Sequence, residues 1–329
     1  MNWYPWLKDA YKQIISFHQK KKAHPVLLLH THSGIGSDAL IYAISRWLMC
    51  HRPIDIKSCG KCHSCKLMLA ETHLDWHKIT LENGKNIIGI ENIRYLIEIL
   101  VTHAQHGGAK VIWFPSLESL SESASNALLK TLEEPTDNTY FLLECRNPSF
   151  LLDTLRSRCF YYHLSIPDYK SVVFWLQKQK SFLELLDIET AIKLNVGAPL
   201  SALSMLQPEN WLKRKRFCQL LLKHLTTKTL FNWLPELDQP NTIERIRWLI
   251  TLLLDAVKYK QQAINYCVNK DQLILFTKLA TMNSTNVLLK SATEWKNCRY
   301  KLISIIGLNQ KLQLTSQLIN WQNRLYNNN

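Results

Sequence analysis

The feature that most constrains the fold is a regular alternation of strand-like and helix-like segments in the first half of the chain. Strand-like segments lie at residues 26–30, 76–80, 110–114, 139–145 and 160–164, and the first of them is a short apolar run of the kind that forms a buried strand. Segments with apolar residues at helical spacing lie between them, at residues 37–48, 91–103, 121–134 and 151–157. Alternating strands and helices form βαβ units, so the sequence predicts an α/β domain with a mainly parallel sheet covered on both faces.

The strand pattern stops at Pro167, and the rest of the chain has only helical signals. Residues 168–207 indicate a few short helices interrupted at Gly197 and Pro199, and helical periodicity continues from Pro208 onward. A chain of 329 residues exceeds what one hydrophobic core usually organises. The sequence therefore predicts two or three domains, the first of them α/β and the remainder all helical.

The net charge of +14 is concentrated in the last part of the chain. Residues 208–329 contain 18 Lys and Arg against 7 Asp and Glu, a net charge of +11, whereas residues 1–207 carry +3. A basic surface can bind nucleic-acid phosphates through counterion release, or it can be a solvated face that meets an acidic partner. Both interpretations stay open. The chain has no signal-peptide pattern and no apolar run long enough to span a bilayer, so we expect a cytoplasmic protein without a membrane partner.

Four of the nine cysteines lie close together with the spacing of a metal site. Cys59, Cys62 and Cys65 are separated by two residues each, and Cys50 precedes them near the end of an expected helix. Thiolates at this spacing suit tetrahedral Zn²⁺. Because four protein ligands leave no open coordination position, we predict a structural zinc site at these cysteines.

Two histidines within this segment, His51 and His63, are substitute ligands for the same site. A set of reduced thiols, or a redox pair, is the alternative interpretation of the cysteines. Binding of zinc would contribute on the order of 10 kcal/mol of apparent free energy to the ordering of this segment.

A strand, a glycine-containing turn and a helix follow one another near the N-terminus, in the order of a phosphate-binding loop. A working loop reads G-x-x-x-x-G-K-[ST], with the Lys on the terminal phosphates and the hydroxyl on Mg²⁺. Segment 31–38 keeps Gly34 and Gly36, but Ser37 stands in place of the Lys and Asp38 in place of the Ser or Thr. A carboxylate at this position repels a triphosphate, so we predict a degenerate loop without productive ATP binding.

A second element of ATP chemistry is missing after the third expected strand. An ATPase of this type ends that strand with an Asp for Mg²⁺ and an acidic partner for the attacking water. The equivalent stretch here is Phe114-Pro115-Ser116, which contains no carboxylate. Two separate departures from the ATPase pattern indicate a fold that does not hydrolyse ATP.

The stretch Leu155-Arg156-Ser157-Arg158-Cys159 offers an arginine that could act on a neighbour's nucleotide. An arginine supplied in trans stabilises charge on a transferring phosphoryl group and is worth about 10³–10⁵ in rate. Taken alone, Arg158 has the alternative interpretation of a salt-bridged surface residue.

Taken together, these stretches resemble the delta-prime subunits of bacterial DNA polymerase III clamp loaders, a family of AAA+ relatives. The matching stretches are residues 3–7, the four cysteines, residues 107–111, the long block 126–135 and residues 155–159. The resemblance is dense through about residue 164 and thinner in the helical half. The block 126–135, together with the Ser-Arg-Cys motif, is its most specific part.

The resemblance implies three domains. An AAA+-like, P-loop-type α/β domain would span residues 1–164 and carry the zinc module at residues 50–65. A small helical lid would follow at residues 165–207, and an all-α collar that joins the five clamp-loader subunits at residues 208–329.

The resemblance also implies a role in DNA replication as a non-catalytic stator. In this family the Ser-Arg-Cys arginine reaches the ATP of a neighbouring gamma/tau-type motor subunit, and the matching residue is Arg158. Active relatives have a sensing Arg in the lid, where this chain has Leu200. The implied partners are the motor subunits and the delta subunit, and through the complex the sliding clamp and primed DNA.

Two other functions remain as alternatives. One is a divergent active ATPase with an unusual loop. The other is a zinc-containing nucleic-acid-binding module acting through the basic C-terminal half, which would bind DNA with a steep dependence on salt. Trp3 and Trp6 are expected to be buried, as large aromatic side chains usually are.

Overall fold

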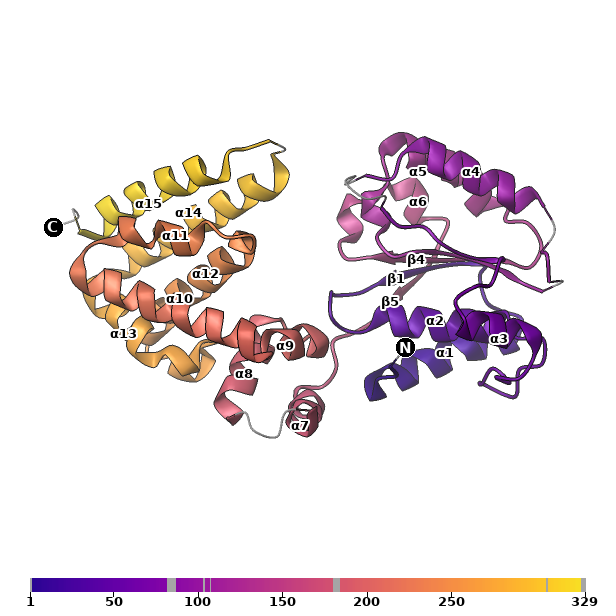
Figure 1. Cartoon of the computed structure of the whole chain (residues 1–329), viewed down its shortest axis with the longest axis horizontal. Helices are drawn as coiled ribbons and strands as arrows, with labels where there is room; N and C mark the ends of the chain where they lie inside the picture. The colour runs from indigo at the N-terminus through magenta and orange to yellow at the C-terminus, as the bar shows by residue number, and fades with distance from the viewer. Residues whose placement is uncertain are drawn as a thin grey trace. The chain divides into compact units, whose positions relative to one another are not determined.

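The computed structural model describes residues 2–81, 87–102, 104–106, 108–179, 184–305 and 307–326. The chain divides into two compact units, Met1–Pro167 and Asp168–Asn329 (Figure 1). Within the described residues all strands lie in the first unit, and the second unit is helical. This confirms the predicted change of structure after Pro167. Gly107, which begins one of the matching stretches, lies outside the described residues.

Five parallel strands form one sheet in the first unit. They are β1 Val26–His30, β2 Trp76–Lys78, β3 Lys110–Phe114, β4 Thr139–Cys145 and β5 Phe160–His163. Their order across the sheet is β2-β3-β4-β1-β5, and every neighbouring pair is parallel. The predicted strands and their parallel arrangement are confirmed. Because all strands run the same way, their carboxyl ends share one end of the sheet, with His30 level with Cys145 and His163.

Helices cover both faces of this sheet, as Figure 1 shows. One face carries α1 Lys8–Gln19, α2 Ser37–Leu48 and α3 His63–Leu69, and the other carries α4 Ile90–Val101, α5 Glu122–Glu133 and α6 Asp153–Arg156. Side chains at helical spacing, including Leu96 and Leu100 of α4 and Leu128 and Leu132 of α5, pack with β3 and β4 in one buried cluster. Helices α1 and α3 are absent from the sequence-based expectations. Short 3₁₀ turns lie at Pro5–Leu7, Leu117–Ser119 and Pro148–Phe150.

The two N-terminal tryptophans depart from the expectation that both are buried. Trp3 is 46% exposed and packs edge-on against Tyr11. Trp6 is half-buried, and its indole N–H donates to the carbonyl of Ile35 at 2.8 Å. The prediction is therefore wrong for Trp3, and Trp6 contacts the glycine-containing turn that follows β1.

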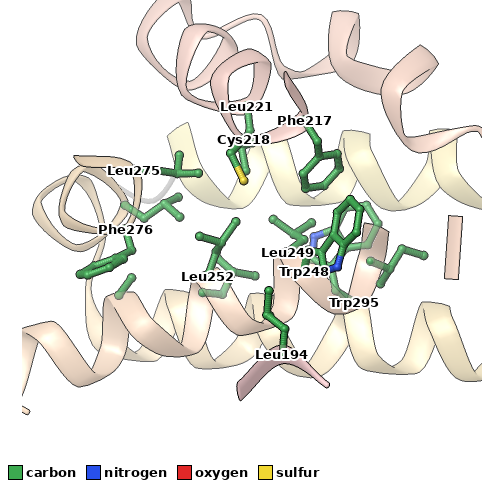
Figure 2. Packing of buried hydrophobic residues seen from close by; sticks show 14 of the residues in the cluster. Leu194, Phe217, Cys218, Leu221, Trp248, Leu249, Leu252, Leu275, Phe276 and Trp295 are labelled. Atoms are coloured by element: carbon green, nitrogen blue, oxygen red, sulfur yellow. The ribbon is translucent and has the colours of Figure 1, made fainter. Parts of the chain in front are cut away.

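The second unit is built from helices around one hydrophobic cluster. Its helices are α7 Tyr169–Gln179, α8 Leu185–Leu194, α9 Pro199–Met205, α10 Pro208–Thr227, α11 Leu234–Leu237, α12 Thr242–Lys260, α13 Leu273–Met282, α14 Thr285–Ser304 and α15 Gln310–Tyr326. Three-ten turns lie at Leu230–Trp233, Ile264–Tyr266 and Lys270–Gln272. In Figure 2, side chains from α10, α12, α13 and α14 meet in this core, among them Phe217, Leu252, Phe276 and Trp295.

The buried cluster of the second unit extends from Val172 of α7 to Leu325 of α15. It therefore includes side chains on both sides of residue 207, where a lid is expected to give way to a collar. That division stays a prediction. None of the helices in the described part of the chain is both long and apolar enough to cross a bilayer.

A polar network is buried inside the second unit. The side chain of Arg214 is fully buried, and it pairs with Asp271 and donates to the Asn269 amide oxygen at 2.8 Å. The Asn269 backbone and side-chain N–H groups donate to Asp255, which is also fully buried, at 2.7 and 2.8 Å. Each buried charge thus has a partner, which offsets its desolvation cost.

Replacing Asp271 by alanine leaves Arg214 as an uncompensated buried charge. We expect this change to destabilise the second unit by about 3–5 kcal/mol, the usual cost of breaking a buried pair from one side. Lys213→Ala removes an exposed charge from α10, the helix that carries Arg214. We expect it to change stability by less than about 0.5 kcal/mol. Denaturant unfolding of the three proteins measures both effects, and equal values for the two variants would contradict this account of the network.

Candidate functional site

Cys50, Cys59, Cys62 and Cys65 lie together next to α2 and α3. Their four sulfur atoms are all within 4.8 Å of one another. Cys50 follows α2, which ends at Leu48, whereas Cys62 is the N-cap of α3 and Cys65 lies in its first turn. Four clustered sulfur donors form a ligand set that can bind a metal ion such as zinc in a tetrahedral arrangement.

Backbone hydrogen bonds orient three of these sulfur atoms. Cys50 Sγ accepts from the N–H of Cys59 at 3.2 Å. Cys59 Sγ accepts from the N–H of Cys62, and Cys62 Sγ from the N–H of Cys65, both at 3.4 Å. Hydrogen bonds from the Lys61 and Cys62 backbone lower the pKa of the Cys59 thiol to about 6. The turn needs Gly60, whose φ of +69° is strained for other residues.

The two histidines considered as ligands lie outside this group of four sulfur atoms. His51 and His63 are both exposed. Buried Ser64, which follows His63, donates to the carbonyl of Met49 at 2.7 Å and lies 2.9 Å from Nε2 of His73. These contacts join the start of α3 to the end of α2, and so hold the chain on both sides of the cysteines.

The glycine-containing turn after β1 connects the strand directly to the N-terminus of α2. Gly34 and Gly36 have φ values of +85° and +89°, a left-handed conformation that glycine adopts without strain. Gly36 is the N-cap of α2, and Ser37 is the first residue of that helix. Ser37 is buried and Asp38 is exposed. The turn and the helix N-terminus are therefore present, but no cation stands at position 37 or 38.

A buried carboxylate lies against this turn. The hydroxyl of Ser37 donates to Oε1 of Glu144 at 2.6 Å, and both residues are only 7% exposed. Glu144 belongs to β4, where it pairs with Leu29 of β1. Burial raises the pKa of the Glu144 carboxyl to about 7, although the hydrogen bond from Ser37 opposes this shift. The position of the missing Lys is thus filled by a hydroxyl that is already bound to an acidic group.

The raised pKa makes the stability of the first unit depend on pH. The folded pKa of Glu144, about 7, lies above the ordinary value of 4.5, so ionisation of Glu144 costs stability progressively between these pH values. We expect Glu144→Gln to stabilise the protein by about 3 kcal/mol at pH 8 and to have little effect at pH 4.5. Denaturant unfolding at both pH values measures this difference, and a pH-independent effect of the substitution would contradict it.

The end of β3 has no carboxylate at the positions expected of an ATPase. Phe114 ends the strand, and Pro115 and Ser116 follow as half-buried residues. An acidic side chain, Glu118, does follow in the next turn. Its carboxylate accepts backbone hydrogen bonds from Arg146 and, at 2.8 Å, from Asn147. Glu118 thereby joins the loop after β3 to the loop after β4.

Arg158 lies in the turn between α6 and β5. Its Nη2 pairs with Glu133 at the end of α5, and its Nη1 donates to the carbonyl of Thr154 at 2.7 Å. The side chain of Arg158 is 30% exposed. The neighbouring Cys159 thiol donates to the carbonyl of Leu155 at 3.2 Å, and burial raises its pKa to about 12, so it is an unreactive thiol. Leu200 is half-buried in the first turn of α9.

Three acidic residues that contact these elements were not among the site residues predicted from the sequence: Glu118, Glu133 and Glu144. Ser37 and Glu144 are 107 positions apart, and Glu133 and Arg158 are 25 apart. No local motif links such partners. Ser37 and Glu144 meet because the strand order places β4 beside β1, and that order has to be known before their contact can be predicted.

Comparison with known proteins places both halves of the chain in one family. Residues 6–168 match the family described as DNA polymerase III, delta subunit, and residues 208–323 match its C-terminal counterpart. The chain is 49% identical to DNA polymerase III subunit delta' of Yersinia pestis, covering 99% of this chain and 97% of that protein. It is 38% identical to the subunit delta' of Escherichia coli (strain K12), over 97% and 95% of the two chains.

A solved structure shares the fold. The structure of a DNA polymerase III gamma subunit-related protein from Thermotoga maritima superposes with a TM-score of 0.51 at 19% identity. The superposition covers 96% of this chain and 99% of that one. At this identity the likeness shows the fold alone. The family, in contrast, follows from sequence identity over nearly the full length: the chain belongs to the delta-prime subunits of DNA polymerase III.

Proposed function

We propose that this chain is a non-hydrolysing stator subunit of the DNA polymerase III clamp loader, which supplies Arg158 to the ATP site of a neighbouring motor subunit. The observation that carries the proposal is the buried contact between Ser37 and Glu144 at its own phosphate loop. A chain that keeps the loop, replaces its cation and retains an arginine near its surface is suited to complete another subunit's site.

Three physical reasons support the absence of productive ATP binding. The Lys that would contact the terminal phosphates is replaced by Ser37. Glu144 and Asp38 bring acidic groups to the start of α2, where a triphosphate would need positive charge. No carboxylate for Mg²⁺ stands at Pro115 or Ser116.

The proposed partners are the gamma/tau-type motor subunits and the delta subunit. Together they would open the sliding clamp and place it on primed DNA in the cytoplasm. Residues 1–164 would act as the AAA+-like domain, residues 165–207 as the lid and residues 208–329 as the collar that packs against the other subunits.

The four cysteines would hold a structural Zn²⁺ in the first domain. Cys50, Cys59, Cys62 and Cys65 supply a complete tetrahedral set, which fits the ion without an open position for substrate. Zinc bound there would contribute to folding of the module and not to catalysis.

Titration of the purified chain with MgATP tests the proposal. We expect no saturable binding and no hydrolysis, with primed DNA present or absent. Saturable binding with magnesium-dependent hydrolysis would overturn the proposal and favour a divergent ATPase. A motor subunit assayed in parallel provides the positive control.

A further inference from the structure

The guanidinium of Arg158 is held by two partners from different elements. Nη2 pairs with Oε1 of Glu133, the last residue of α5, and Nη1 donates to the carbonyl of Thr154 in α6 at 2.7 Å. A free Arg side chain samples many rotamers, and fixing it costs entropy. The contacts with Glu133 and Thr154 already restrict the Arg158 side chain in the folded protein. Less conformational entropy is therefore lost when a phosphate binds.

The two elements that hold Arg158 are themselves fixed by the core. Leu132, next to Glu133, and Leu155, next to Thr154, are each 1% exposed and belong to the same hydrophobic cluster. The backbone positions of both partners are therefore set by packing beneath them. The site lies at the junction of α5, α6 and β5.

The ion pair between Glu133 and Arg158 lies at the surface, where it contributes little to the free energy of unfolding. The side chain of Glu133 is 48% exposed and that of Arg158 30% exposed, and ion pairs in such positions contribute little to stability. A guanidinium has five N–H donors. One bond to Glu133 and one to Thr154 leave further donors on the same group for an external phosphate oxygen.

We propose that Glu133 is a positioning residue, which fixes the Arg158 guanidinium in the orientation needed to contact a nucleotide phosphate on the neighbouring subunit. The inference rests on the proposed function, because it assumes that Arg158 acts in trans. Glu133 does not touch the nucleotide. It acts by holding the arginine, as outer-shell partners hold metal ligands and catalytic groups.

Steady-state ATP hydrolysis by the reconstituted clamp loader with primed DNA tests this role. The loader should contain one competent motor site, the one next to this chain. We expect Glu133→Ala to lower kcat about 10–100-fold, the usual cost of losing an orienting partner, and to leave KM for ATP within twofold. Glu133→Asp keeps the charge and should recover part of the rate. Glu91→Ala breaks a similar exposed pair, with Arg94 at 2.8 Å, and should leave the rate unchanged.

The variant Glu133→Ala/Arg158→Ala shows whether the two residues act together. If Glu133 acts through Arg158, its removal lowers the rate in the native chain but has no further effect after Arg158→Ala. An equal loss in both backgrounds, or no loss in the native chain while Arg158→Ala is strongly impaired, would overturn the inference. If Arg158→Ala itself hydrolyses ATP at the native rate, the proposed function fails instead. Sedimentation of each loader checks that assembly is intact.

Discussion

Replacing Arg158 by alanine is expected to lower ATP hydrolysis by about 10³-fold or more at the motor site that this chain completes. The guanidinium would stabilise the charge that develops on the transferring phosphoryl group, and no other cation of the chain is proposed for that role. The measurement is single-turnover phosphate release by the assembled loader with primed DNA, with only the adjacent motor site competent. In a fully active loader the other sites would mask most of the loss.

Arg156→Ala is the matched control for this prediction. Arg156 lies two positions away, is 45% exposed and forms an exposed pair with Asp153 at 3.5 Å. We expect its removal to change the rate by less than about twofold, because exposed pairs of this kind contribute little. Equal rates for Arg158→Ala and the native loader, with assembly intact, would leave Arg158 as an ordinary surface residue and contradict its role in trans.

Removal of the proposed zinc ion is the second change with a large expected effect. Structural zinc contributes on the order of 10 kcal/mol to the folding of small metal modules. We expect chelation to make residues 50–69 sensitive to protease while the helical second unit stays folded. Limited proteolysis followed by mass spectrometry locates the cleavage sites. Cleavage that is unchanged by chelation of the zinc-loaded protein would contradict a structural role for the metal.

Substitution of single cysteines tests the proposed zinc ligands. Cys62→Ser is expected to leave less than one zinc per chain, because a hydroxyl is a poor replacement for a thiolate ligand. Cys298→Ser, in the second unit, should keep the full metal content. Atomic absorption after gel filtration measures both. Full zinc content in Cys62→Ser would exclude this residue from the ligand set.

The central strands of the first unit could be predicted closely because β1, β3 and β4 are mostly apolar and buried. Segments 110–114 and 139–145 coincide with β3 and β4. The parallel direction of the strands was also predicted, since helices separate them along the chain. Helix α1 was not predicted, although its buried Ala10 and Ile14 are spaced four residues apart, as on one face of a helix.

The candidate site was predictable only where its residues are neighbours in the chain. The cysteine spacing and the altered loop at Ser37 and Asp38 are local patterns. Glu144 lies in an apolar strand and gives no signal of its own, since its role depends on the pairing of β4 with β1. Glu133 lies in the matching block 126–135, but its contact with Arg158 forms only after α5 and α6 pack on the sheet.

A cryo-electron microscopy structure of the complete clamp loader, with primed DNA and a slowly hydrolysed ATP analogue, tests most directly whether this chain completes a neighbour's site. We predict that Arg158 lies within hydrogen-bonding distance, about 3 Å, of the γ-phosphate bound by the adjacent motor subunit. We also predict that loop 31–38 of this chain holds no nucleotide. Analogue bound in that loop, or Arg158 turned away from every phosphate, would contradict the account.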